Sequence, residues 1–365
     1  MRYRRVVRYL THLRNYLTLR KTINYVKYWN DLRNRKVVTS SFPPQIAFQP
    51  SAYCNSNCQL CPVGLRIKGP EKGSLEFDRF KEIIDLTKEY LTRIDFGDWG
   101  EPFLNPDIFE MIKYAEEKKI MTAASTNLHL FKNEDDLKRI LDSGLSFLTI
   151  SLHGVSQESY EAYQPGKNFE QAVKKIQSLV SLKRKLKKGE PIIDLVFTIT
   201  KKNQHEIEKM RQFAKDLKAD SITYTASLNL RFYLDDVDKL TKITKEWALE
   251  ESDSRPRDTS AFGKDRATKL YEAILKGKHL SFDELDALKL TGRHFCLDPW
   301  RSLVVNWDGT VSLCCVDYDK YVMGDTRTES IIEIWNNEKY RAVRHYLLGQ
   351  TKTNLDFPCK RCVVY

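Results

Sequence analysis

Six short apolar runs alternate with amphipathic helical stretches between residues 43 and 235, and this alternation restricts the fold more than any other feature. The predicted strands are Gln45–Pro50, Arg93–Gly97, Ile120–Ser125, Phe147–Leu152, Ile192–Thr198 and Ser221–Thr225. The helices expected between them are Phe77–Leu91, Pro106–Glu117, Glu134–Asp142, 169–184 and Gln204–Leu217. Repeated strand–helix units favour an α/β fold with a parallel sheet and right-handed crossovers. Ligands of such sheets bind at the carboxyl ends of the strands.

Three cysteines follow the first predicted strand with the spacing C-x3-C-x2-C: Cys54, Cys58 and Cys61. No fourth cysteine lies nearby in the sequence. A structural zinc site takes four protein ligands, and an electron-transfer iron–sulfur cluster takes four thiolates. Three thiolates on a [4Fe–4S] cluster leave one iron open to a small molecule. The loop therefore predicts a cluster that binds a ligand.

A second set of cysteines lies near the C-terminus, at Cys296, Cys314, Cys359 and Cys362. The turn signal 307–310 between two apolar runs predicts a hairpin that brings Cys296 and Cys314 together. Four thiolates give a fully ligated site, either a second iron–sulfur cluster or a structural zinc ribbon. Cys315 is the alternative ligand if the register is shifted by one residue.

Residues 1–36 carry eleven basic residues and one acid, whereas the rest of the chain is almost neutral. Val6, Leu10, Leu13 and Leu17 form one helical stripe, so residues 1–42 are expected to be a basic amphipathic helical arm. Three interpretations stay open: the stripe packs on the body, the arm lies on the inner face of a membrane, or it binds a protein or nucleic acid.

The chain shows no signal peptide and no apolar run of about 20 residues, so it is expected in the cytoplasm. Residues 236–290 are rich in charge and read as a helical connector. Residues 291–365 form a second module, which carries the later cysteines.

Together the two cysteine sets resemble the radical SAM superfamily with a C-terminal SPASM domain in its shortened twitch form. The resemblance implies a partial (β/α)6 TIM-like barrel over residues 43–235 and an auxiliary-cluster domain over 291–365. It also implies two [4Fe–4S] clusters, one of which binds S-adenosylmethionine (SAM). The expected ligands are Cys54, Cys58 and Cys61 for the first cluster and Cys296, Cys314, Cys359 and Cys362 for the second.

Other strand ends are similar to SAM-contacting motifs of the family. Gly100-Glu101-Pro102 resembles the Gly-Gly-Glu-Pro motif near the SAM amino group, with Trp99 in place of the first glycine. By resemblance, Ser125, Thr126, Asn127 and Ser151 lie near the SAM ribose or methionyl part. His153 stands where the family usually has aspartate. Gln164 stands where an arginine usually pairs with the SAM carboxylate, so a bidentate salt bridge is excluded.

The resemblance implies reductive cleavage of SAM to a 5′-deoxyadenosyl radical, which abstracts a hydrogen atom from the substrate. A reductase, flavodoxin or ferredoxin would supply the electron. The four-cysteine set is most similar to that of the cyclitol dehydrogenase of butirosin biosynthesis, which favours dehydrogenation of an alcohol on a sugar, cyclitol or lipid-linked substrate. Candidate bases are His153, His294, Asp317 and Tyr318.

Three other functions stay open on the sequence. The main rival is a ribosomal-peptide maturase that forms a thioether, a crosslink or an epimer. The second is a nucleic-acid modifying or binding protein that uses the basic arm, although the neutral body argues against it. The third is a scaffold without enzymatic activity, which would make no 5′-deoxyadenosine.

Overall fold

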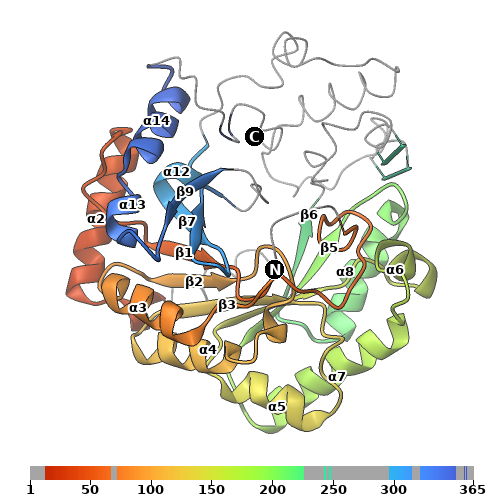
Figure 1. Cartoon of the computed structure of the whole chain (residues 1–365). Coiled ribbons are helices and arrows are strands. Elements are labelled where there is room, and N and C mark those ends of the chain that lie inside the picture. The colour runs from red at the N-terminus through yellow and green to blue at the C-terminus, as the bar shows by residue number, and fades with distance from the viewer. Residues whose placement is uncertain are drawn as a thin grey trace.

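The computed structural model describes residues 13–66, 72–225, 242–243, 246–247, 296–314, 321–350, 357 and 359. Its centre is one sheet of nine strands in the order β6-β5-β4-β3-β2-β1-β7-β8-β9 (Figure 1). The first six strands are all parallel: β1 Gln45–Phe48, β2 Arg93–Phe96, β3 Met121–Thr126, β4 Phe147–Ser151, β5 Ile192–Thr198 and β6 Ser221–Thr225. The predicted α/β partial barrel is confirmed.

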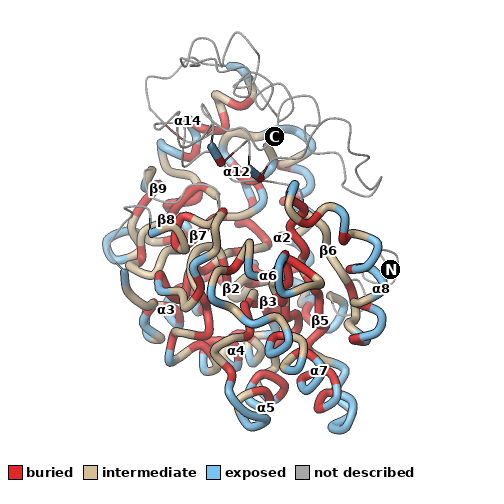
Figure 2. Tube along the Cα trace, turned by 90° about the vertical axis from the view of Figure 1, so that its right-hand side faces the viewer, coloured by how far each residue is buried: buried red, intermediate tan, exposed pale blue. Residues whose placement is uncertain are grey.

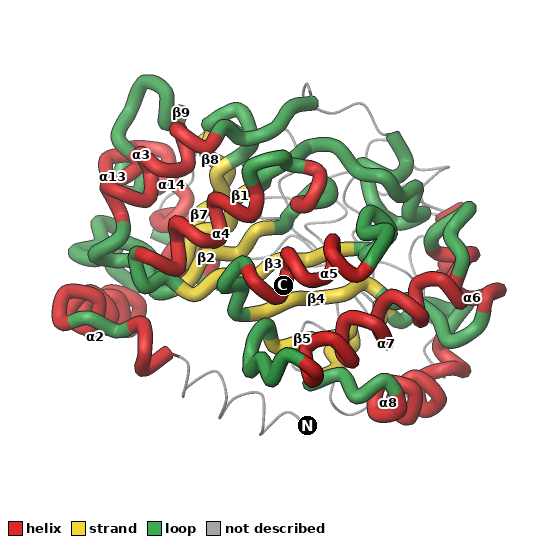
Figure 3. The backbone as a smooth tube through the Cα atoms, turned by 90° about the horizontal axis from the view of Figure 1, so that it is seen from below, coloured by secondary structure: helices red, strands yellow, loops and turns green. Residues whose placement is uncertain are grey.

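Helices on the outside of the curved sheet connect successive strands (Figures 1 and 3). They are α3 Phe77–Thr87, α4 Ile108–Glu117, α5 Glu134–Asp142, α6 Gln157–Tyr163, α7 Phe169–Lys185 and α8 Ile207–Asp216, with short 3-10 turns η1 Pro102–Leu104 and η2 Gln204–Glu206. Six of the seven residues of β5 and five of the six of β3 are buried. Such near-continuous burial is typical of parallel strands covered on both faces.

Most predicted elements lie within a few residues of the observed ones, and the sequence missed α6. The predicted helix Gln204–Leu217 is split into η2 and α8. Asn168 explains a sharp boundary at α7, because its side chain accepts a hydrogen bond from the N–H of Gln171 and so caps the helix. Buried residues run continuously through the strands and the facing sides of the helices (Figure 2).

The C-terminal part continues the barrel sheet and does not form a separate one. Helix α12 Asp298–Arg301 leads into β7 Ser302–Val305, which pairs in parallel with β1, in the register Gln45↔Ser302 to Phe48↔Val305. The hairpin predicted around residues 307–310 is confirmed: β8 Thr310–Ser312 pairs antiparallel with β7, and β9 Val322–Asp325 pairs with β8. Helices α13 Ile331–Ile334 and α14 Glu338–Leu347 follow.

The N-terminal arm is helical at residues 13–16 and again in α2 Leu19–Arg33. Leu13 packs beside buried Tyr16 under the barrel, whereas Leu17 is 38 % exposed. Val6 and Leu10, the first half of the predicted stripe, lie outside the described residues. Almost all of the predicted connector 236–290 is outside them as well.

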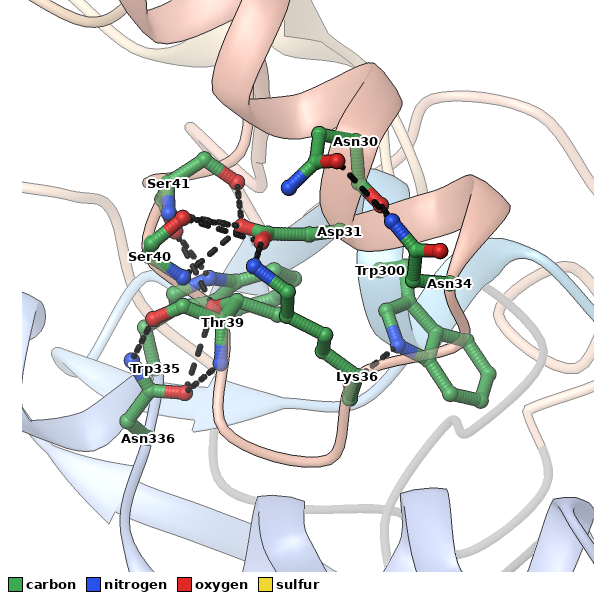
Figure 4. A network of polar contacts seen from close by, with 10 residues as sticks. All are labelled: Asn30, Asp31, Asn34, Lys36, Thr39, Ser40, Ser41, Trp300, Trp335 and Asn336. Atoms are coloured by element: carbon green, nitrogen blue, oxygen red, sulfur yellow. Dashed lines mark hydrogen bonds and ion pairs between the residues drawn. The ribbon is translucent and has the colours of Figure 1, made fainter.

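A network of polar contacts joins the arm to the C-terminal part (Figure 4). Buried Asp31 accepts hydrogen bonds from the backbone N–H of Ser40 at 2.7 Å and of Ser41 at 2.9 Å, and Lys36 pairs with it at 2.9 Å. The indole N–H of Trp300 donates to the carbonyl of Lys36 at 2.7 Å. Residues 36–41 are therefore held from both sides.

Arg344 completes this joint from α14. Its fully buried guanidinium donates to the backbone carbonyls of Pro299, Val37 and Trp335, each at 2.9 Å, and lies over the Trp335 ring at 4.5 Å. Burial lowers the pKa of Arg344 to about 10, so the group is still charged at neutral pH. A buried arginine with several acceptors fixes the position of α12, which begins two residues after Cys296.

Candidate active site

Cys54, Cys58 and Cys61 lie in the loop that follows β1, and each is partly buried. The N–H of Cys61 donates to the carbonyl of Cys58 at 3.3 Å. A Cβ on Gly64 would lie 2.4 Å from the backbone nitrogen of Cys58, so only glycine allows this close approach. The loop thus turns tightly around Cys58 at the carboxyl end of the sheet.

The three thiols fit an iron–sulfur cluster. Burial raises the pKa of Cys54 to about 11, and burial together with the charges of Cys61 and Cys54 raises the pKa of Cys58 to about 12. The sulfurs are therefore near enough to repel one another as thiolates, and iron binding would displace their protons. Within the described ranges, no three His, Cys, Asp or Glu side chains lie at the spacing of a single-ion site.

Two amide side chains point at the sulfurs. Asn127 Nδ2 lies 4.0 Å from the sulfur of Cys54 and donates to Asn55 Oδ1 at 2.7 Å. Gln164 Nε2 lies 3.7 Å from the sulfur of Cys58. Gln164 is 1 % exposed, and its Oε1 has no hydrogen-bond partner in the described part of the chain. An orphan buried acceptor beside the cluster loop is consistent with a ligand that completes it.

The Gly100-Glu101 segment lies against the cysteine loop. Gly100 has φ +102°, and a Cβ there would lie 2.0 Å from the carbonyl oxygen of Ser51. The N–H of Glu101 donates to the carbonyl of Tyr53 at 2.7 Å. Glycine is therefore required where the end of β2 crosses the loop, and Pro102 starts η1 directly after it.

The Glu101 carboxylate lies between the ends of β2 and β3. It is 2 % exposed and accepts hydrogen bonds from the N–H of Asn127 at 2.9 Å and of Phe103 at 3.4 Å. Burial raises the pKa of Glu101 to about 7. A buried carboxylate with no ion pair in the described part of the chain is a natural acceptor for an ammonium group of a ligand.

The other predicted strand-end residues lie at the same edge. Thr126 is buried at the end of β3 and its hydroxyl accepts the N–H of Leu128 at 2.9 Å. Ser125 and Ser151 are half-buried. The Ser125 hydroxyl would be 3.1 Å from a Cβ on Gly97, the residue after β2. The structure brings these residues together with the cysteine loop, while their contacts with SAM stay predictions.

His153 is buried and its Nδ1 accepts the N–H of Thr198 at 3.1 Å. Its ring lies 4.1 Å from the ring of Tyr163, centroid to centroid. Burial lowers the pKa of His153 to about 3, so the ring is neutral and carries its proton on Nε2. This geometry is that of a satisfied core histidine, and a catalytic role for His153 stays a prediction. The other candidate bases, His294, Asp317 and Tyr318, lie outside the described residues.

Sequence reasoning missed two aromatic residues, Tyr163 and Trp247, beside the cysteine loop. The carbonyl of Tyr163 accepts the N–H of Gln59 at 3.0 Å, and its ring meets Trp247 edge-on at 6.0 Å. Trp247 is 3 % exposed although it comes from the charged connector. Single aromatic residues at a helix end and in a polar segment gave no periodic signal that could have placed them here.

His129 and Tyr160 form a second missed pair, with His129 Nε2 2.7 Å from the Tyr160 hydroxyl. The N–H of His129 donates to Asn127 Oδ1 at 2.9 Å, so the pair supports the residue that points at Cys54. Burial and the charges of Lys167 and Lys175 together lower the pKa of His129 to about 4.

Two of the later cysteines, Cys296 and Cys314, flank the strands that extend the same sheet. Cys296 and Cys359 are partly buried and pack against the core, and Cys314 follows β8. Cys362 and the alternative ligand Cys315 lie outside the described residues. A Cβ on Gly73 would lie 2.0 Å from the ring of Trp307, so the return of the cysteine loop packs directly on the C-terminal hairpin.

The comparisons with known proteins agree with this arrangement. Residues 48–214 match the model of the radical SAM superfamily, and residues 296–363 match SPASM, an iron-sulfur cluster-binding domain. The chain belongs to the radical SAM superfamily and carries a C-terminal SPASM domain. The predicted cofactors follow from these domains: SAM and two iron–sulfur clusters.

Curated relatives carry several different names. The tungsten-containing aldehyde ferredoxin oxidoreductase cofactor-modifying protein of Pyrococcus furiosus is 22 % identical over 330 residues, 86 % of this chain and 85 % of that protein. An AdoMet-dependent heme synthase of Methanosarcina barkeri is 28 % identical over 185 residues, half of each chain. An Fe-coproporphyrin III synthase of the same organism is 24 % identical over 317 residues, 80 % of this chain and 74 % of that protein.

Solved structures share the fold at low identity. Streptococcus suis SuiB bound to precursor peptide SuiA has TM-score 0.58 and 17 % identity, covering 88 % of this chain and 70 % of that one. Native anSMEcpe with bound AdoMet has TM-score 0.51 and 17 % identity, covering 82 % of each chain. BtrN in complex with AdoMet and 2-DOIA has TM-score 0.48 and 17 % identity, covering 85 % of this chain and 88 % of that one, a likeness too loose to support a substrate.

Proposed function

We propose that this chain is a radical SAM oxidoreductase that removes a hydrogen atom from an alcohol-bearing sugar or cyclitol and oxidises it to the carbonyl. The observation that carries the proposal is the continuity of the sheet. β1 leads into the three-cysteine loop and pairs along its other edge with β7, which lies between Cys296 and Cys314. The cysteine loop and two ligands of the second set, Cys296 and Cys314, are thus attached to neighbouring strands of one sheet.

The residues around the first cysteine loop have separate tasks in this proposal. Glu101 takes the SAM ammonium, because it is a buried carboxylate whose donors among the described residues are neutral: the N–H groups of Asn127 and Phe103 and the hydroxyl of Thr126. Gly100 lets the backbone approach the ligand. Gln164 and Asn127 hold the sulfurs of Cys58 and Cys54 through N–H donors. When bound, the SAM-carrying cluster supplies the electron that cleaves SAM to the 5′-deoxyadenosyl radical.

Net oxidation requires a second electron acceptor, and the second cysteine set supports one. Four thiolates leave no open iron, so such a cluster is suited to accept an electron rather than to bind substrate. Trp307 packs on Gly73, which keeps the SPASM hairpin against the cysteine loop. A reductase, flavodoxin or ferredoxin would deliver the first electron. The arm gives no support for a lipid-linked substrate, since its contacts lie at the opposite end of the strands.

A second candidate is modification of a tetrapyrrole side chain, which the similarity to an AdoMet-dependent heme synthase and an Fe-coproporphyrin III synthase favours. A ribosomal peptide is a third, supported by the shared fold with SuiB bound to its precursor peptide. A nucleic-acid substrate has less support, because the basic arm packs at the end of the barrel away from the cysteine loop.

The first experiment is anaerobic reconstitution with iron and sulfide, followed by iron counting and incubation with dithionite and SAM. We expect about eight irons per chain and formation of 5′-deoxyadenosine, with about four irons and no product for C58A. C314A and C315A form a matched pair, because only the true auxiliary ligand should lower the iron count.

Substrate is then tested by panels of polyols, iron coproporphyrins and peptides, with SAM-dependent substrate loss as the readout. Turnover of a polyol with formation of a ketone supports the leading proposal. Turnover of only a porphyrin or a peptide refutes the alcohol substrate while leaving the radical SAM chemistry intact. Absence of 5′-deoxyadenosine with fully loaded clusters refutes the enzyme proposal itself.

A further inference from the structure

Helix α2 buries its polar side and exposes its apolar side, the reverse of an ordinary surface helix. Its buried residues are Lys21, Asn24, Tyr28 and Asp31. The outward side carries large apolar side chains with the exposed fractions Leu19 77 %, Ile23 48 %, Val26 65 % and Trp29 54 %. At 100° per residue, Leu19, Ile23 and Val26 share one stripe opposite the buried residues.

The inward side is fixed by hydrogen bonds to residues that precede the barrel strands. Lys21 Nζ donates to the carbonyls of Lys118 and Lys119, just before β3. Asn24 Nδ2 donates to the carbonyl of Phe42 at 2.9 Å, before β1, and of Tyr90 at 3.2 Å, before β2. The helix therefore lies across the amino ends of the strands, and it cannot rotate to bury its apolar side without breaking these contacts.

The charged side chains on the outward side of α2 are all cationic. Arg20, Lys27 and Arg33 are exposed, whereas the only acid of the helix, Asp31, is 1 % exposed and paired with Lys36. Arg20 lies 3.9 Å from Glu89 of the neighbouring turn, but its side chain is 76 % exposed. Exposed aliphatic and tryptophan side chains flanked by cations are the composition of helices that lie in the interface of anionic membranes.

The apolar surface continues beyond the helix. A cavity of about 480 Å³ opens between α2, the end of α3 and α13, and two cations, Arg20 and Lys27, and one acid, Glu89, line it. Its rim carries Leu86 at 54 % and Ile332 at 36 % exposure. The exposed apolar area is thus broader than one helix stripe, and large contiguous patches of this kind mark interaction surfaces.

We propose that the outward side of α2, which we call the α2 outer face (Leu19, Arg20, Ile23, Val26, Lys27 and Trp29), binds the surface of an anionic lipid bilayer. Charge and polarity together favour this partner. The charged residues of the α2 outer face are all cationic, and its apolar side chains would make no favourable contact with nucleic-acid phosphates. Because α2 lies at the amino ends of the strands, the bound protein keeps the cysteine loop directed away from the lipid.

The test is co-sedimentation of the full, anaerobically purified chain with vesicles of phosphatidylcholine alone or with about one-third phosphatidylglycerol. We expect binding only to the anionic vesicles, weakened by salt, with a blue shift of Trp29 emission that W29F removes. R20Q/K27Q should weaken binding about 25-fold, since each cation near such a surface contributes about fivefold. L19S/V26S should weaken it by at least about tenfold.

The matched control is R184Q/K185Q, which removes two exposed cations from the end of α7, on the other side of the barrel from α2 (Figure 1). It should leave vesicle binding unchanged. The proposal is overturned if the intact chain stays in the supernatant, if it binds both vesicle types equally, or if R20Q/K27Q and R184Q/K185Q behave alike. A dimer that L19S/V26S makes monomeric, without vesicle binding, would assign the face to a second copy of the chain instead.

Discussion

Replacing Asp31 tests whether the joint of Figure 4 holds the arm and the C-terminal part together. In the wild-type chain, the buried N–H and hydroxyl of Ser41 each donate to Asp31 Oδ2 at 2.9 Å. In D31A both donors lose this acceptor, and Lys36 loses its ion-pair partner. Ser40 is exposed, so water can replace its bonds. One buried unsatisfied N–H together with lost charge-assisted bonds predicts a decrease of about 2–4 kcal/mol in the free energy of unfolding. D31N keeps one acceptor and should lose about half as much.

The assay is urea unfolding followed by tryptophan fluorescence, because Trp300 and Trp335 both donate to backbone carbonyls within the joint. D85A is the control: Asp85 pairs with Lys88 at 3.1 Å, but both side chains are about two-fifths exposed, so a change below about 0.5 kcal/mol is expected. Equal effects of D31A and D85A would contradict the reasoning.

The pH dependence gives a second check on the same residue. Burial alone would raise the pKa of Asp31, but hydrogen bonds from Lys36, Ser41 and Ser40 hold it below its usual range. A depressed folded-state pKa contributes stability above the unfolded value, near 4, which is lost as the pH falls through the folded value. The difference between the wild-type chain and D31A should therefore shrink below about pH 4.

Three further predictions concern other parts of the molecule. G100A should lower the free energy of unfolding by about 3 kcal/mol and abolish SAM binding, because it adds positive-φ strain to a backbone clash. G166A, with φ +73° and open space around it, should lower the free energy of unfolding by only about 1 kcal/mol. Calorimetry of unfolding and SAM titration measure both variants. Burial lowers the pKa of Lys21 to about 8, so the folded chain binds fewer protons than the unfolded chain between about pH 8 and 10.5. As the pH rises through that range, the free energy of unfolding of the wild-type chain should increase by up to about 3 kcal/mol relative to K21M, as measured by urea unfolding. Q164L removes the N–H donor to Cys58 and should move the midpoint potential of the first cluster to a more negative value in an anaerobic redox titration. Q59L is the control: it loses only an exposed contact to Asn57 and should leave the midpoint potential unchanged.

The barrel could be predicted from the sequence because its strands are buried on both faces and its helices are clearly amphipathic. β5 and β6 were predicted with the observed bounds, and so was α5, whose N-cap Asn133 precedes three acids. The same periodicity located the strand ends, and thereby the motifs around Glu101 and Asn127. The cofactors were predicted from the resemblance of the two cysteine sets to the radical SAM superfamily, since spacing alone left a zinc ribbon open for the second set.

Contacts between distant segments could not be predicted in this way. Periodicity predicts that a segment is a strand but not which strand it pairs with, so the pairing of β1 with β7 could not be predicted. The inverted burial of α2 reverses the usual rule, since Lys21 and Asn24 are buried only because free carbonyls before the strands accept their hydrogen bonds. Trp247 packs on Tyr163 although the segment that carries it was predicted as a charged helical connector.

The position of β1 between β2 and β7 also has a consequence for biosynthesis. A ribosome makes β1 long before β7, so the outer edge of β1 stays unpaired while the other five parallel strands are made. An unpaired edge strand invites pairing with other chains. Pairing across such a sequence separation is slow to form. Cluster insertion into the cysteine loop before that edge is covered would take place on an unfinished barrel, so the pairing of β7 with β1 is the natural point at which the loop becomes ready for iron.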